Sequence, residues 1–198
     1  MIVIFDLELT AWPGSVQRNW TGPGEFAEII QIGAVRLDDE MCEIGALDLA
    51  IKPRLNPILS DYIVGLTGLT QERVDRDGVS LEAGLARLAR FAEGSRALLC
   101  NGGDAEWIRY NVGLAKIDSP LDGMRFASLS HHFRQAAGRA DHIVSSTLPA
   151  TFGFDVAGRA HDGLADARAI SEALRRTMPC GGISALLASL TDVGGRHA

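Results

Sequence analysis

Two acidic residues stand close together at the end of the first apolar segment of the chain. Asp6 and Glu8 are separated by one residue and lie at the C-terminal end of an apolar run, residues 2–7, that is rich in β-branched residues and typical of a buried strand. Side chains two positions apart on a strand point to the same side, and two neighbouring carboxylates repel each other unless a cation lies between them. The pair therefore indicates a metal site at a strand end.

A second polar group lies at the start of the most regular helical pattern, residues 162–178. His161 precedes this helix and Asp166 falls in its first turn, so both side chains can face one site. Asp162 is equally consistent with a simple helix N-cap. Asp166 is surrounded by small and apolar residues, where a solvated acid is not expected. We therefore favour a functional role for His161 and Asp166.

The elements that must position these residues follow from the hydrophobic periodicity. Strands are predicted at residues 2–7, 28–37, 44–51 and 97–100, and helices at 60–66, 70–76, 80–93, 162–178 and 181–190. The stretch that follows Asp104 is also predicted to be helical, and the weaker pattern over residues 118–152 predicts two helices. The turn-rich residues 10–25 predict a long surface loop. This order is typical of a mixed sheet flanked by helices.

Composition limits the classes of protein to consider. The 198 residues include 46% hydrophobic and 22% charged residues, so we expect one globular domain, residues 1–198, with a sizeable core. The net charge of −6 argues against a general positive field for nucleic acid, so any such contact must be local or assisted by metal. Three widely spaced cysteines and an N-terminus unlike a signal peptide predict a cytoplasmic protein with no membrane partner.

The polar groups together resemble a known set of motifs. The segment Phe5-Asp6-Leu7-Glu8-Leu9-Thr10, the central Asp104 after a strand, and His161 with Asp166 are similar to the three exonuclease motifs of the DEDDh (DnaQ-like, RNase T-like) 3'–5' exonuclease superfamily. The order and spacing agree from residue 2 to about residue 178. Residues 28–35, 59–61, 66–70 and 158–161 most resemble the Eri-1/KapD branch, which includes enzymes that trim structured RNA 3' ends.

This resemblance implies an α/β architecture, the ribonuclease H-like exonuclease fold. Its mixed central sheet would combine a three-strand antiparallel meander with parallel strands, and helices would flank it. The resemblance also implies two Mg²⁺ or Mn²⁺ ions, held by four carboxylates that can neutralise them: Asp6, Glu8, Asp104 and Asp166. His161 would act as the general base, with Glu8 as the second catalytic residue.

The resemblance also assigns residues to the substrate. Leu9 and Thr10 would lie beside the terminal nucleotide, and Leu66 and Thr67 belong to a segment that would pack against its base, with His161 nearby. Three residues of the first loop are expected either to contact bases and phosphate or simply to pack the loop: Trp12, Arg18 and Trp20.

The central acid has one competitor. Many relatives place an aromatic residue immediately before this acid, whereas Gly103 precedes Asp104 here, so Glu106 remains an alternative ligand. Helix phase favours Asp104, because the apolar Trp107 and Ile108 follow it at three and four residues and fit an inward face.

The resulting functional hypothesis is a metal-dependent 3'–5' exonuclease. It would release 5'-mononucleotides from the 3' ends of single-stranded RNA or DNA, and a homodimer is an open alternative to a monomer. Two other hypotheses are a phosphodiesterase for a small nucleotide and a catalytically silent nucleic-acid-binding module. Retention of all five motif residues argues against the silent module, because repelling carboxylates have no reason to stay together without turnover.

Overall fold

The computed structural model describes residues 1–193, which form five strands and eight α-helices. The first part of the chain contains β1 (Ile2–Leu9), β2 (Ile29–Leu37), β3 (Glu43–Ala50), α1 (Asp61–Thr67), α2 (Gln71–Asp77) and α3 (Leu81–Phe91). The second part contains β4 (Leu98–Cys100), α4 (Asp104–Ala115), β5 (Phe126–Ser128), α5 (Ser130–Ala137), a 3-10 turn (Ser145–Thr147), α6 (Leu148–Phe152), α7 (Gly163–Thr177) and α8 (Gly182–Ser189).

The strands form one mixed sheet in the order β3-β2-β1-β4-β5. Strands β1, β2 and β3 are an antiparallel meander, whereas β4 and β5 run parallel to β1. The predicted α/β architecture with a mixed central sheet is therefore confirmed. Because β4 lies beside β1, the acids at the end of β1 come close to the residues that follow β4.

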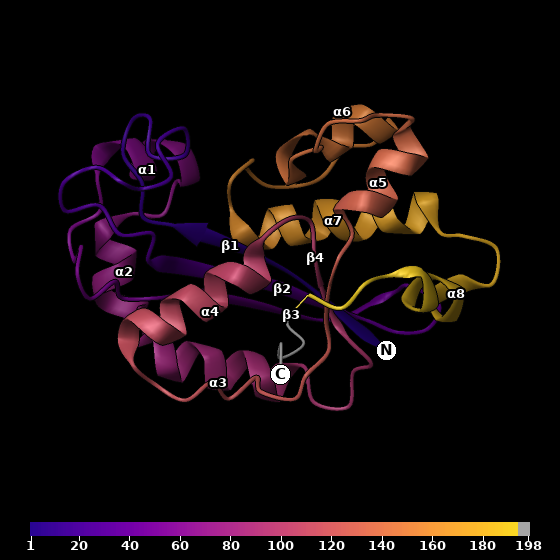
Figure 1. The fold of residues 1–198 in the computed structure, drawn as a ribbon, viewed down its shortest axis with the longest axis horizontal. Coiled ribbons are helices and arrows are strands. Elements are labelled where there is room, and N and C mark those ends of the chain that lie inside the picture. Colours follow the sequence, from indigo (N-terminus) through magenta and orange to yellow (C-terminus); the bar gives the residue numbers. More distant parts are fainter. Residues whose placement is uncertain (194–198) are drawn as a thin grey trace.

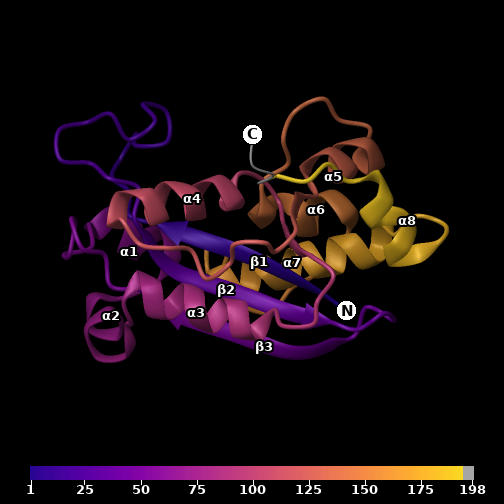
Figure 2. The same cartoon turned by 60° about the horizontal axis from the view of Figure 1, so that its bottom comes forward.

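Helices cover both faces of the sheet, and α7 and α3 lie on opposite sides of the strands (Figure 1). Ile2 and Ile4 of β1 pack in one apolar cluster with α5, α7 and α8, while Val3 and Phe5 pack in a second with α3 and α4. This alternation is the period of two that a strand imposes. Helices α5, α6 and α8 gather at one end of α7 (Figure 2).

The helices between β3 and β4 begin where the sequence predicts them. Ser60, Thr70 and Ser80 are the N-caps of α1, α2 and α3, and each side-chain oxygen accepts a hydrogen bond from the backbone N–H three residues on. Such caps satisfy N–H groups that have no partner within the helix. Among the described residues, no helix combines the length and the apolar character needed to cross a membrane.

The prediction for residues 118–152 was incomplete. Two helices, α5 and α6, are present there, but the short strand β5 precedes them and pairs with β4. The strand has only three residues, of which Ala127 alone is buried. A strand this short shows no alternation in the sequence, so its position depends on pairing with β4.

Helix α7 approaches the sheet through two glycines. A Cβ atom on Gly33 would overlap the backbone of Gly163 and Leu164. Gly33 lies opposite Asp6 in the β1–β2 ladder, so this approach places the start of α7 beside the acids of β1. The chain thus requires the smallest residue at this position.

We expect Gly33→Ala to lower the free energy of unfolding by about 1–3 kcal/mol, because the added methyl group forces α7 away from β2. Gly113→Ala is the matched control: Gly113 lies in α4, where a Cβ atom meets no other atom within 4 Å. This control should raise stability by up to about 1 kcal/mol. Urea denaturation measures both, and equal stability of Gly33→Ala and the wild type would contradict the packing argument.

Candidate active site

Strand β1 supplies the two acids at the floor of the site. Asp6 and Glu8 are each only 7% exposed, and they continue the face of β1 that carries Ile2 and Ile4. That face is covered by α7, so both carboxylates point toward the start of this helix. The Ser145 hydroxyl donates a hydrogen bond to Asp6 Oδ1 at 3.1 Å, which fixes one carboxylate oxygen.

Helix α7 supplies the third acid. Asp166 is 5% exposed, and its Oδ2 accepts a hydrogen bond from the backbone N–H of His161 at 3.1 Å. The buried Gln31 of β2 holds the helix in place, because its Oε1 accepts from Gly163 N–H and its Nε2 donates to Asp162 Oδ2, each at 3.1 Å. Asp162 is the N-cap of α7, as one of the two interpretations of the sequence held.

Helix α4 supplies the fourth acid, and it is Asp104 that faces the site. Asp104 is the first residue of α4 and lines the same pocket as Asp6, Glu8 and Asp166. Glu106 is exposed instead and pairs with Arg109 at 3.1 Å on the outer side of the helix. The geometry therefore favours Asp104 over Glu106 as the central acid.

These acids surround a pocket of about 240 Å³ at the end of β1. Four segments that are distant in the sequence form its wall, namely β1, the start of α4, residues 142–146 and the residues around the start of α7. The side chains that define its chemistry are Asp6, Glu8, Asp104, Trp107, His161 and Asp166.

His161 stands at the rim beside two of the acids. One ligand atom from each of Glu8, His161 and Asp166 lies within 4.8 Å of the other two, a grouping that could hold a cation. His161 has a left-handed backbone, with φ of 63°, a conformation that costs free energy for a residue other than glycine. Partial burial, and then the nearby Arg159, lower the pKa of the imidazole, so the ring is neutral near pH 7 and can accept a proton.

Burial raises the pKa of all four carboxyl groups above the ordinary range. The pKa of Glu8 rises to about 9, because burial and the nearby Asp166 and Asp104 disfavour its charge. Burial raises the pKa of Asp104 and of Asp166 to about 6. The pKa of Asp6 is also well raised, first by burial and then by Asp104 and Glu8. The cluster is therefore electrostatically unfavourable without a counter-charge.

A divalent cation fits this group of residues. Carboxylate oxygens are the ligands that Mg²⁺ and Mn²⁺ prefer, and a bound cation would replace the mutual repulsion of the acids with attraction. The residues in position to hold such ions are Asp6, Glu8, Asp104 and Asp166, the four acids that the sequence pattern indicates.

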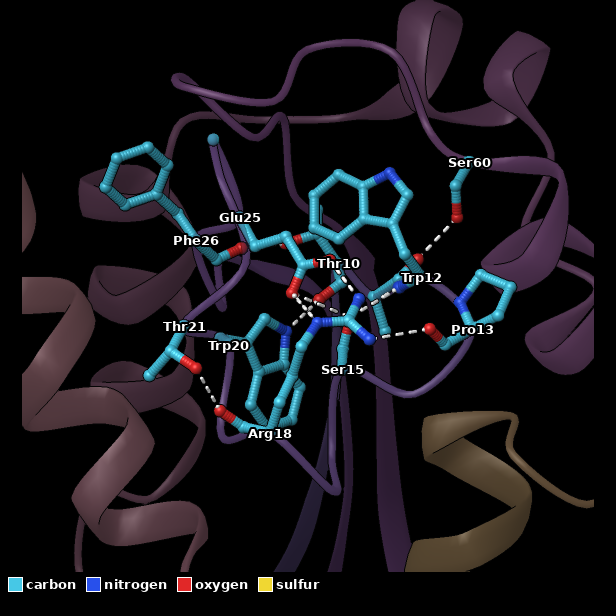
Figure 3. Close-up of polar contacts among 12 residues, drawn as sticks. Thr10, Trp12, Pro13, Ser15, Arg18, Trp20, Thr21, Glu25, Phe26 and Ser60 are labelled. Atoms are coloured by element: carbon cyan, nitrogen blue, oxygen red, sulfur yellow. Dashed lines mark hydrogen bonds and ion pairs between the residues drawn. The ribbon is translucent and has the colours of Figure 1, made fainter.

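Polar contacts among its own residues hold the first loop, residues 10–26, in place (Figure 3). The Arg18 guanidinium forms an ion pair with Glu25, and Trp20 Nε1 donates to the Thr10 carbonyl at 2.7 Å. The Trp20 ring contacts Trp107 edge-on, with ring centroids 5.0 Å apart. Arg18 and Trp20 thus hold the loop together, while the half-buried Trp12 has no ring contact of this kind among the described residues.

Of the residues expected to bind substrate, His161 lines the pocket, whereas Leu9, Thr10, Leu66 and Thr67 are not among the described residues that line it. The Thr10 hydroxyl donates to the Phe26 carbonyl at 2.5 Å, and the Thr67 hydroxyl donates to the Ile63 carbonyl at 2.8 Å, so both serve internal hydrogen bonds. Leu9 and Leu66 are partly exposed. Arg159 donates to the Gly65 carbonyl and so joins the end of α1 to the segment before His161.

The structure brings four further polar residues to the pocket that the sequence pattern did not indicate: Asn101, His142, Ser145 and Ser146. Asn101 Nδ2 donates to the Ile143 carbonyl at 2.8 Å, which fastens residues 142–146 to the end of β4. No motif marks this segment, because it reaches the acids only through the course of the chain after α5.

The family follows from the comparison with known proteins. Residues 3–174 match the RNase_T family model, which describes an exonuclease. The chain belongs to this exonuclease family, and the resemblance to DEDDh enzymes is confirmed.

Curated relatives point to the Eri-1-like branch. The mouse 3'-5' exoribonuclease 1 (Mus musculus) is 27% identical over 196 residues, which cover 91% of this chain and 53% of that protein. ERI1 exoribonuclease 2 of Xenopus laevis is 36% identical over 87 residues, which cover 43% of this chain and 12% of that protein. The chain thus spans about half the length of the mouse relative.

Solved structures share the ribonuclease H-like fold. The nuclease domain of 3'hExo, a DEDDh family member bound to rAMP, aligns with a TM-score of 0.75 at 24% identity, over 97% of this chain and 95% of that one. Escherichia coli Exonuclease I in complex with a dA16 oligonucleotide aligns with a TM-score of 0.66 at 19% identity, over 94% and 42% of the two chains.

The two candidate central acids can be separated by metal binding. We expect Asp104→Ala to weaken Mn²⁺ binding by at least about 10-fold, because substitution of a residue that only supports a metal ligand already lowers metal affinity by that factor. Glu106→Ala should change the affinity less than about twofold, because an exposed ion pair contributes little. Titration calorimetry measures both, and the reverse ranking would assign the ligand to Glu106.

The pH dependence of stability follows from Glu8. Its folded pKa of about 9 exceeds the unfolded value of 4.5, so the folded state holds the extra proton and loses stability as pH rises toward 9. Above pH 7 histidines are neutral in both states. A unit of pH is then worth about 1.4 kcal/mol, or roughly 3–6 °C in Tm.

We therefore expect the Tm of the protein in EDTA to fall by about 4–8 °C between pH 7 and pH 8.5. The fall should be smaller in Glu8→Gln, which carries no titrating proton, and Mg²⁺ should stabilise the wild type more at the higher pH. Differential scanning fluorimetry tests this, and equal slopes for the two proteins in EDTA would contradict it.

Proposed function

We propose that the protein is a metal-dependent 3'–5' exonuclease that removes 5'-mononucleotides from the 3' end of single-stranded RNA or DNA. The observation that carries the proposal is the convergence of four carboxylates and His161 on one pocket at the end of β1. RNA is the first substrate to test, because the curated relatives are named exoribonucleases.

In this proposal Asp6, Glu8, Asp104 and Asp166 hold two Mg²⁺ or Mn²⁺ ions. When bound, such ions stabilise the negative charge that develops on the attacking and leaving oxygens of an in-line phosphoryl displacement. The buried acids keep the charged groups in fixed positions, and Ser145 orients Asp6 through its hydrogen bond.

His161 is the proposed general base. Its neutral imidazole accepts the proton that the attacking water must lose, and the adjacent Glu8 and Asp166 then stabilise the imidazolium. The hydrogen bond from His161 N–H to Asp166 fixes the backbone from which the ring extends. The proposed proton acceptor, His161, thus lies next to two of the proposed metal ligands, Glu8 and Asp166.

The terminal nucleotide is proposed to lie between β1 and α1. Leu9 and Leu66 offer partly exposed apolar side chains for its sugar and base. Thr10 and Thr67 are each only 2% exposed and their hydroxyls are engaged, so these two residues would support this part of the site from beneath.

The proposed setting is the cytoplasm. Cys42 and Cys180 are exposed free thiols and Cys100 is a buried one, a state that a reducing compartment maintains. The proposed partner is a single-stranded 3' end. Homodimer formation stays a prediction, which sedimentation velocity would test.

Digestion of matched 5'-labelled RNA and DNA oligonucleotides tests the activity. With Mg²⁺ or Mn²⁺ we expect a ladder that shortens from the 3' end, and with EDTA none. Asp166→Ala should abolish turnover with the fold intact, and His161→Ala should reduce the rate by about 10²–10⁴-fold, the contribution typical of a general base.

The alternatives give different products. A phosphodiesterase for a small nucleotide would cleave dinucleotides and ignore longer chains. A binding module would retain the oligonucleotide without cleavage under any metal. Near-normal activity of Asp166→Ala would contradict the assignment of the metal ligands.

A further inference from the structure

His142 lies in the wall of the acidic pocket, and the proposed mechanism does not use it. It belongs to the segment between α5 and the 3-10 turn, which faces the residues after β4 across the pocket. His142 is exposed, whereas the acids on the pocket floor are largely buried. The ring is therefore accessible to a ligand that enters the pocket.

The ring and its backbone are both held in place. His142 Nδ1 lies 2.8 Å from the Ser130 hydroxyl, at the start of α5. The other side of the ring lies against Gly102, where a Cβ atom would be 3.7 Å from both Cε1 and Nε2. The next carbonyl, that of Ile143, accepts the hydrogen bond from Asn101. With Nδ1 engaged by Ser130, Nε2 is the ring nitrogen left to bind a ligand.

A nucleotide strand in this pocket needs donors for its phosphate oxygens. The lining that the structure describes contains neither lysine nor arginine, and its only imidazoles are those of His142 and His161. His161 stands beside Glu8 and Asp166 and is assigned to proton transfer. His142 is therefore the unassigned imidazole that can donate to a phosphate, since a Ser130 hydroxyl that donates to Nδ1 leaves the proton on Nε2.

We propose that His142 donates a hydrogen bond from Nε2 to a phosphate oxygen of the nucleotide strand, and so determines substrate affinity rather than the rate of the chemical step. This inference rests on the proposed function, because it assigns a role in the same pocket. Ser130 acts as a positioning residue that orients the ring.

The test compares His142→Ala, His142→Gln and the control His131→Ala. Glutamine keeps an N–H donor of similar reach, and His131 is an exposed residue of α5 that lies outside the pocket and faces Arg134. Two measurements are made with Mg²⁺: KM and kcat for trimming of a single-stranded RNA, and the affinity for AMP and for adenosine by calorimetry. Circular dichroism confirms that each variant is folded.

We expect His142→Ala to raise KM about 10-fold with kcat within about twofold, the loss typical of a hydrogen bond to a charged group. The glutamine variant should recover part of this loss, and His131→Ala should match the wild type. A parallel loss of affinity for AMP but not adenosine places the contact at the phosphate of the terminal nucleotide. A raised KM with unchanged AMP affinity places it at a phosphate further along the strand.

Unchanged KM and unchanged AMP affinity in His142→Ala would overturn the inference and leave the exonuclease proposal intact. A fall in kcat alone would also overturn it, because His142 would then act in the chemical step. If the wild type trims no oligonucleotide, the proposed function fails, and the AMP measurements decide the inference separately: weaker AMP binding in His142→Ala supports it. A wild type that trims neither RNA nor DNA and does not bind AMP overturns both.

Discussion

The direct contact between helix α7 and strand β2 determines the geometry of the site. Gly33 and Gly163 let the two backbones touch, and Gln31 bonds to both the first N–H group and the N-cap of the helix. Asp6 lies opposite Gly33 in the sheet, so the same contact places Asp166 beside the acids of β1. A larger residue at this point would separate carboxylates that are proposed to share a cation.

The rest of the fold sustains a group of residues that is unfavourable by itself. Burial raises the pKa of every carboxyl group in the cluster, as expected where like charges are removed from water. Two apolar layers, one on each face of the sheet, supply the stability that offsets this cost. The metal-free site therefore stores electrostatic repulsion, and a bound cation relieves it.

The negative net charge of the chain is consistent with a nucleic-acid substrate when cations neutralise the acids of the pocket. A net charge of −6 would repel a polyanion at long range, but the charge that matters is that of the pocket with its cations in place. Two imidazoles of the pocket act within this local field at short range: His142 is the proposed donor to phosphate, and His161 is the proposed general base. Their positions depend on Ser130 and on the left-handed backbone of His161.

The sequence by itself determined the order of most elements and the buried strand β1, and it predicted the candidate acids, because these depend on local periodicity and on chemistry that few residue types provide. Helix phase already favoured Asp104 over Glu106, and the tertiary structure added that Asp104 lines the pocket while Glu106 pairs with Arg109 on the outer side of α4. The sequence also did not predict strand β5 or the position of His142 in the pocket wall. Strand β5 depends on its pairing with β4, and residues 142–146 depend on the hydrogen bond that Asn101 donates to Ile143. Both interactions join segments far apart in the chain, which no local pattern encodes.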